Sequence, residues 1–321
     1  MFYKKIPLIL GICAMITLSA CNNHFRNAQI EPPASEIAAM QKLEPAAGHL
    51  MMDYMPKPIP VASVMLPDSI ESPIWQQNRA IGYEVISDKP KIVVVIDDLG
   101  LNRKRSDAVA DLPGPLTLAY LPYGKRLKEQ TKRAQQNGHE LMVHMPMQPL
   151  GEADPGPNAL LAGLSEKDIL KRIRKNLSAF DGYVGINNHM GSAFTQDVAG
   201  LNVLMAELQK RDILYLDSRT SALSKAESIA RKFNVATTVR DVFIDHEMSP
   251  VFVENALKKV ERTARRHGSA IAIGHPHDVT TAALAEWLPT LEAKGFQLVP
   301  ITSVMFERDP RINEYAMSRE N

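Results

Sequence analysis

Acidic, amide and imidazole side chains follow five short apolar runs of this sequence. They are Asp97 and Asp98 after residues 92–96, His144 after 141–143, Asn187, Asn188 and His189 after 184–186, Asp217 and Ser218 after 213–216, and His275 after 270–273. Carboxylates and imidazoles are ligands of catalytic metal ions and common proton carriers in active sites. The residue types therefore predict metal-assisted acid–base chemistry, provided that the fold brings the five runs together.

Strands and helices that alternate after Pro90 are the elements expected to position these side chains. The predicted strands are residues 92–96, 116–121, 141–143, 184–186, 213–216, 236–239, 270–273 and 297–301. The predicted helices between them are residues 103–111, 125–137, 166–180, 198–211, 222–232, 250–267 and 280–294. This alternation is typical of parallel strands with crossover helices. We expect an α/β fold, a distorted (β/α) barrel of seven or eight parallel strands, over residues 90–306.

Each polar residue also has a purely structural explanation when it is taken alone. Asp98 can cap a helix, and His144 and His189 can be satisfied core histidines. We favour a shared site because a parallel barrel gathers the carboxyl ends of its strands on one rim. Asp97 and Asp98, as neighbours in a strand, are expected to point in different directions, so that one binds a metal and the other takes a proton.

Three segments resemble motifs of carbohydrate esterase family four, the polysaccharide deacetylases. Residues 95–100, Val-Ile-Asp-Asp-Leu-Gly, are similar to its Asp-Asp-Gly motif. Residues 138–144 are similar to its metal-binding histidine motif, and residues 272–275 to its last motif. Two features depart from the pattern, because Gln148 stands where a second metal histidine is expected and an Arg-Pro-Tyr motif is absent.

These departures have a counterpart in a distant branch of the same barrel. The segments His-Met-Pro-Met at 144–147, Asn-Asn-His-Met-Gly-Ser at 187–192 and Asp-Ser-Arg-Thr at 217–220 together resemble the divergent polysaccharide deacetylase family. The resemblance covers about residues 90–306. It implies the barrel fold, a carbohydrate substrate and removal of N-acetyl groups from a polysaccharide or a peptidoglycan-type glycan.

The resemblance implies a role for each residue at the rim. Asp97 is expected to be the general base and His275 the general acid. Asp98, His144 and His189 are expected to bind one divalent metal ion, with zinc as the first choice.

Further residues are expected to support these groups. Asp217 is assigned to orient His275 or a substrate hydroxyl, and Ser218 to contact the substrate. Asn187 and Asn188 are expected to hold the sugar, with turn residues of positive φ as the alternative. Asp241 and Asp245 are expected to line the same rim, with Asp241 as a substrate contact, or to lie in a solvated loop.

The amino-terminal segment has the features of an export signal. A basic start precedes the apolar residues 6–18, and Leu-Ser-Ala-Cys at 18–21 resembles the lipobox of bacterial lipoproteins. We expect residues 1–20 to be a signal peptide and Cys21 to carry a lipid on the periplasmic side of the envelope, with the outer membrane favoured over the inner. The proline-rich residues 21–89 are expected to form a disordered linker, and 307–321 a polar tail.

Charge and cysteine usage exclude several classes of function. The 37 Lys and Arg residues nearly balance the 36 Asp and Glu residues, so nothing predicts nucleic-acid binding. The two cysteines, Cys13 and Cys21, precede the barrel, so a catalytic metal there must use histidines and carboxylates. A glycan-binding or regulatory barrel without catalysis, and a hydrolase acting on a glycoside or an ester, remain the alternatives.

Overall fold

The computed structural model describes residues 73–80, 85–86 and 88–309, which belong to one unit of the chain. Its strands are β1 Lys91–Leu99, β2 Thr117–Tyr120, β3 Glu140–Met147, β4 Tyr183–Met190, β5 Leu214–Asp217, β6 Thr237–Val239, β7 Val242–Phe243, β8 Ser269–Gly274 and β9 Gln297–Leu298. Its α-helices are α2 Ile74–Gln77, α3 Arg103–Ala110, α4 Leu127–Gln136, α5 Glu166–Leu177, α6 Val198–Lys210, α7 Ala226–Lys232, α8 Pro250–His267, α9 Asp278–Trp287 and α10 Thr302–Arg308. The predicted signal peptide and Cys21 lie outside the described residues.

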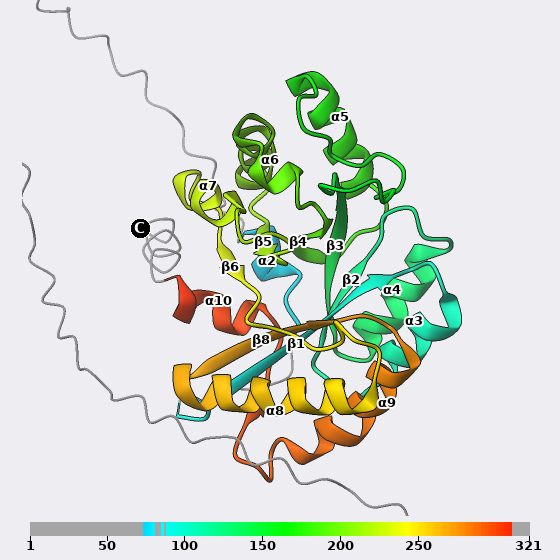
Figure 1. Ribbon diagram of the computed structural model, residues 1–321, viewed down its shortest axis with the longest axis vertical. Helices are drawn as coiled ribbons and strands as arrows, with labels where there is room; N and C mark the ends of the chain where they lie inside the picture. The colour runs from blue at the N-terminus through cyan, green and yellow to red at the C-terminus, as the bar shows by residue number, and fades with distance from the viewer. Residues whose placement is uncertain (1–72, 81–84, 87, 310–321) are drawn as a thin grey trace, which may run out of the picture. The chain divides into compact units, whose positions relative to one another are not determined.

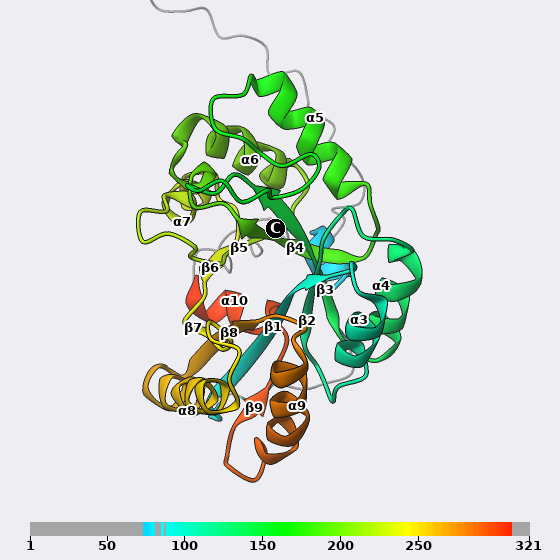
Figure 2. The ribbon, with the colours of Figure 1, turned by 45° about the vertical axis from the view of Figure 1, so that its right-hand side comes forward.

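The strands form one parallel sheet that coils into a barrel. Their order is β6-β5-β4-β3-β2-β1-β8-β7, and β9 pairs with the start of β1. The edge strands β6 and β7 are consecutive in the chain and are separated only by Arg240 and Asp241. The Arg240 amide donates to Asp217 O of β5 and the Asp241 amide to Ile271 O of β8, so the backbone joins the two edges. The predicted parallel barrel is confirmed (Figures 1 and 2).

Two apolar cores hold the barrel together. The larger core lies between the sheet and helices α3 to α9, which surround it (Figure 1). The smaller core fills the interior, where alternate strand residues such as Val93, Val95, Ile271 and Ile273 meet. Successive side chains of a β-strand point to opposite faces of the sheet, so every other residue faces the interior of the barrel. The same alternation determines which polar residues face the interior.

The amino ends of the strands are closed by chain segments from both ends of the domain. Trp75 of α2 and Met305 of α10 belong to the interior core. Asn78 donates to Tyr183 O at the start of β4. The folded part therefore begins before the predicted boundary at residue 90, because residues 73–80 already pack on the barrel.

Local signals place the helices that flank the rim. Ser249 caps α8 by accepting from the Phe252 amide, with Pro250 at the first turn, and Gly268 ends that helix with φ 79°. Ser165 caps α5 in the same way. Among the described residues no helix combines the length and the apolar character that a membrane crossing requires.

Candidate metal centre

The inward positions of three strands change from apolar to titratable at their carboxyl ends. Along β1 the inward series Val93, Val95 is continued by Asp97. Met142 of β3 is followed two residues later by His144. Directly after β8, His275 continues the series Ile271, Ile273. The alternation that fills the interior with aliphatic side chains thus delivers a carboxylate and two imidazoles to its open end.

Asp98 departs from this alternation, because it turns toward His144 although its neighbour Asp97 already faces inward. The pairing of β1 with β2 is irregular between Ile96 and Leu99, and Asp98 has the left-handed φ of 57°. The closest oxygens of Asp97 and Asp98 lie 3.8 and 3.2 Å from His144 Nε2. The expectation that the two carboxylates point in different directions is wrong. A non-glycine residue at positive φ is strained, and such strain is concentrated at functional sites.

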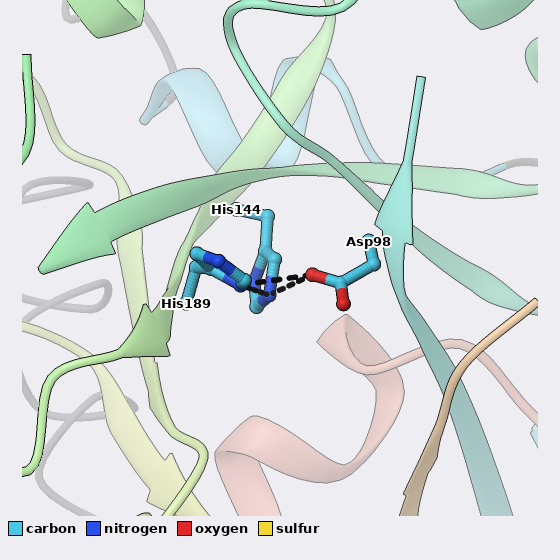
Figure 3. Close-up of side chains that lie close together, drawn as sticks. All are labelled: Asp98, His144 and His189. Carbon is cyan, nitrogen blue, oxygen red and sulfur yellow. Dashed lines mark hydrogen bonds and ion pairs between the residues drawn. The ribbon is translucent and has the colours of Figure 1, made fainter. Parts of the chain in front are cut away.

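Three atoms with lone pairs converge at the rim, one each from β1, β3 and β4 (Figure 3). Asp98 Oδ1 lies 2.8 Å from His189 Nδ1 and 3.2 Å from His144 Nε2, and the two histidine nitrogens are 3.2 Å apart. Zinc ligands at tetrahedral angles lie about 3.3 Å from one another, given bond lengths of about 2.0 to 2.1 Å. The three atoms therefore have the spacing of a tridentate metal site.

The three atoms Asp98 Oδ1, His144 Nε2 and His189 Nδ1 form a triangle, and the hydrogen bonds around this triangle also favour a cation at its centre. Asp98 Oδ1 is buried and has no hydrogen-bond partner among the described residues, although two imidazole nitrogens lie beside it. His144 Nδ1 lies 2.8 Å from Asn187 Oδ1, which accepts its proton and leaves Nε2 free to bind a metal. A divalent ion held by Asp98, His144 and His189 would supply the partner that the protein does not provide.

The protein also arranges charge around the triangle. Burial raises the pKa of Asp98, but the imidazoles of His144 and His189 outweigh burial and hold that pKa well below its usual range. Burial raises the pKa of Asp97, and His144, His275 and Asn187 offset that rise only in part. Asp98 is therefore the ionised member of the converging group, whereas Asp97 is the carboxylate that more readily takes a proton.

His275 forms a hydrogen-bonded pair with Asp245. Its Nδ1 lies 3.0 Å from Asp245 Oδ1, and its backbone amide donates to Asp245 Oδ2 at 2.6 Å. Thr280 also donates to this carboxylate. Burial lowers the pKa of His275, but Asp245, Asp97 and Asp98 outweigh burial and raise it to about 9. His275 Nε2 faces the centre, 3.9 Å from Asp98 Oδ2.

Asp217 does not orient His275, which corrects the sequence-based assignment. Asp217 has the same parity as Tyr215, whose side chain lies in the outer core. Its carboxylate accepts from Ser224 Oγ and from the Arg219 amide. Alternation turns it to the outside of the sheet, and Asp245 takes the role that Asp217 was expected to fill.

The two asparagines of β4 face opposite sides and neither is open to a substrate. Asn187 is fully buried between His144 and Asp97. Asn188 faces outward, where its Oδ1 accepts from the Ser218 amide and from Tyr215 OH. The predicted sugar contacts of both residues are wrong, because their amide groups are used within the protein.

Ser218 and Asp241, the remaining predicted substrate contacts, are also used within the protein. Ser218 is 4% exposed, and its hydroxyl accepts from Asn187 Nδ2 at 3.3 Å. Asp241 accepts from the Ile271 amide and from Arg308 of α10, both at 2.7 Å. Asp241 therefore supports the junction of the barrel edges and is not a substrate contact.

Comparisons with known proteins identify the family of the chain. The family profile described as divergent polysaccharide deacetylase matches residues 94–305. The chain belongs to the divergent polysaccharide deacetylase family. It is 33% identical over 217 residues to the uncharacterized protein YibQ of Escherichia coli K12, a match that covers 68% of each chain. It is 34% identical over 209 residues to an uncharacterized protein of Haemophilus influenzae Rd, covering 65% of this chain and 74% of that one.

A solved structure supports the same family fold. The crystal structure of the uncharacterized protein Atu2773 from Agrobacterium tumefaciens C58 superposes with a TM-score of 0.70 and 28% identity, over 72% of this chain and 95% of that one.

In this member of the family the third candidate ligand atom comes from a neighbouring strand. Gln148 is turned away, with its Oε1 accepting from the Ala162 amide at 2.8 Å. His189 of β4 is in register with Pro146 of β3, two residues beyond His144. His189 thus supplies from β4 the imidazole that the commoner pattern places on the segment of His144, and Gln148 is no evidence for a lost metal site.

Proposed function

We propose that this protein is a metal-dependent deacetylase that removes N-acetyl groups from a glycan of the cell envelope. The observation that carries the proposal is the convergence of Asp98, His144 and His189 on one point, with a second carboxylate and a further histidine beside it. The family description supports a carbohydrate substrate.

The residues divide the reaction among them. The metal ion, which we propose to be zinc, would polarise the acetamido carbonyl and lower the pKa of water when bound. Asp97, buried 3.8 Å from His144 Nε2, is the base that takes the proton of the attacking water. His275, whose Nδ1 is held by Asp245, gives a proton to the departing amine from Nε2. Acetate and a free amino sugar are the products.

The location of the substrate is proposed from the amino-terminal sequence. Residues 1–20 are assigned as a signal peptide, and Cys21 as a lipid-bearing residue that anchors the protein on the periplasmic side, with the outer membrane favoured. Mass spectrometry of the mature amino terminus tests this assignment, and Cys21→Ser is expected to abolish lipid attachment. An unmodified Cys21 in the processed protein would overturn it. The location makes peptidoglycan the first glycan to test.

The experiment measures acetate release by the full chain supplied with zinc. N-acetylglucosamine oligomers and purified peptidoglycan serve as substrates. Release should require the metal and should be lost in His189→Ala, but not in His267→Ala, which removes an exposed histidine at the end of α8. A protein that binds zinc but releases no acetate from either glycan would contradict the deacetylase assignment.

A further inference from the structure

Asn187 lies at the centre of the site without being able to touch a substrate. It is in register with His144 across β3 and β4, and its side chain is fully buried. Its Oδ1 lies 2.8 Å from His144 Nδ1, and its Nδ2 donates to Asp97 Oδ1 at 2.7 Å and to Ser218 Oγ at 3.3 Å. One amide group thus joins a metal ligand to the base.

We propose that Asn187 is a positioning residue that sets the base and the metal-binding histidine together. This inference rests on the proposed function, since it assigns Asp97 and His144 the roles given above. It adds that a single amide fixes the direction of the Asp97 carboxylate and the tautomer of His144.

The chemistry of the three groups allows one self-consistent arrangement when Asp97 is ionised. A carboxylate only accepts hydrogen bonds, so the amide must turn its NH₂ toward Asp97. Its oxygen then faces His144 Nδ1, which must carry a proton in order to donate. The remaining lone pair of a neutral His144 therefore lies on Nε2, which is 3.2 Å from Asp98 Oδ1 and from His189 Nδ1. An ionised base and a histidine ready to bind metal are thus specified together.

An asparagine is the side chain that this position requires. Aspartate would accept from His144 but would have no donor for Asp97 when ionised. Leucine has a similar size and offers neither a donor nor an acceptor. The two substitutions therefore separate the hydrogen bond to the ligand from the hydrogen bond to the base.

The test compares zinc affinity with acetate release in full-length Asn187→Asp and Asn187→Leu. Asn187→Asp should keep a zinc affinity within about threefold of the wild-type value or raise it, because a carboxylate holds the His144 tautomer at least as well. Its acetate release should fall about 100-fold or more, since the base loses its donor and gains a like charge. Asn187→Leu should lose about 10- to 100-fold in zinc affinity, the usual effect of removing such a partner.

Asn176→Leu is the matched control, because Asn176 of α5 is also buried and donates to Met145 Sδ and Asn158 O outside the site. It should lower stability and leave zinc affinity and turnover unchanged. Nitrogen NMR of zinc-free protein should find the His144 proton on Nδ1 in the wild type and in Asn187→Asp. If Asn187→Leu does not fold, Asn187→Asp and this tautomer decide the question.

Wild-type zinc affinity in a folded Asn187→Leu, or equal losses of zinc and turnover in Asn187→Asp, would overturn the proposal. So would an Nε2-protonated His144 in the wild type. Zinc affinity and the tautomer need no turnover. A wild type that binds zinc but releases no acetate therefore overturns the deacetylase reaction alone, and the His144 measurements still decide the role of Asn187.

Discussion

The two ends of the barrel bury the same kinds of side chain and use them differently. At the amino end, Glu140 begins β3, and its carboxylate accepts from the Ala80 amide and from the amide and hydroxyl of Thr302. At the carboxyl end, Asp98 Oδ1 is buried beside two imidazoles and has no hydrogen-bond partner in the part of the chain that the structure describes. The buried carboxylate at the amino end has hydrogen-bond donors from its own chain, whereas the buried carboxylate at the carboxyl end lies in a group of side chains that could hold a metal ion.

Two histidines close together in the chain, His139 just before β3 and His144 within it, show the same difference. His139, just before β3, lies 3.0 Å from Ala110 O through Nε2 and accepts from the Leu116 amide through Nδ1, so both nitrogens are used. His144, five residues later, uses one nitrogen for Asn187 and turns the other to the triangle. Burial therefore does not distinguish the two histidines. They differ in that His144 has a ring nitrogen that faces the lone pairs of other candidate ligands.

Removing the base should produce the largest effect. Asp97→Asn keeps a side chain of the same size beside His144 but cannot take a proton, so acetate release should fall about 10²- to 10⁴-fold. Zinc content should stay at the wild-type level, because Asp97 is not one of the three converging atoms. Steady-state kinetics together with elemental analysis measure both values, and an active Asp97→Asn would remove Asp97 from the reaction.

Removing the Asp245 carboxylate, the partner of the proposed acid His275, should have the next largest effect. The size of this effect should depend on pH. The acid works only when protonated, so activity should fall as pH rises through the pKa of His275, about 9. The base works only when ionised, so activity should also fall at low pH, below the raised pKa of Asp97. Asp245→Asn removes a carboxylate that raises the pKa of His275, so the alkaline limb should move to lower pH.

The rate of Asp245→Asn near pH 8 should fall about 10- to 100-fold, as for other partners of functional histidines. Asp241→Asn is its control, because Asp241 lies in the same segment but pairs with Arg308. A pH profile of kcat/KM that is identical in Asp245→Asn and the wild type would contradict the pairing.

At the amino end, Glu140 should affect stability and leave catalysis alone. Burial raises its pKa from 4.5 to about 7, which the hydrogen bonds from Thr302 and Ala80 offset only in part. Glu140 ionises at lower pH in the unfolded chain than in the folded protein. The contribution of the protonated, buried Glu140 to the free energy of unfolding is therefore full below pH 4.5 and is lost as pH rises through about 7. The slope is at most about 1.4 kcal/mol per pH unit.

Glu140→Gln should remove this pH dependence. In denaturant titrations, the free energy of unfolding of the wild type minus that of the variant should therefore decrease from pH 5 to pH 8. Glu254→Gln on the exposed face of α8 is the matched control and should leave the wild-type pH dependence in place. A constant difference between wild type and Glu140→Gln across this range would refute the linkage.

The smallest effect is expected at Asp217. Because its carboxylate faces Ser224 on the outside of the sheet, Asp217→Asn should leave kcat and the pH profile unchanged and should cost about 1 kcal/mol of stability. Kinetics and thermal unfolding of this variant measure both. A loss of activity comparable with that of Asp245→Asn would restore Asp217 to the site.

The fold and the approximate location of the site could be predicted from the sequence, because the alternating apolar runs place their carboxyl ends on one rim. It did not resolve which side chains face inward. Asp217 ends β5 and Ser218 follows it, and only packing shows that Tyr215 is an outward residue, which turns Asp217 outward as well. Asp245 was placed at the rim without a role, because β7 spans only Val242–Phe243 and gives no recognisable strand pattern.

The conformation of Asp98 was also beyond sequence reasoning. Its positive φ depends on the irregular pairing of β1 with β2, which is a property of the assembled sheet. By contrast, the convergence of Asp98, His144 and His189 was predicted, since strand ends and residue chemistry placed them on one rim and the family resemblance assigned them to one metal ion.

Metal binding by the full chain tests the central claim most directly. Equilibrium dialysis against zinc, with cobalt as a spectroscopic substitute, should give one tightly bound ion per chain for the wild type and for Asp97→Asn. Asp98→Ala, His144→Ala and His189→Ala should each lose it, whereas His267→Ala should keep it. A wild type that binds neither ion, or three site variants that keep wild-type affinity, would contradict the account.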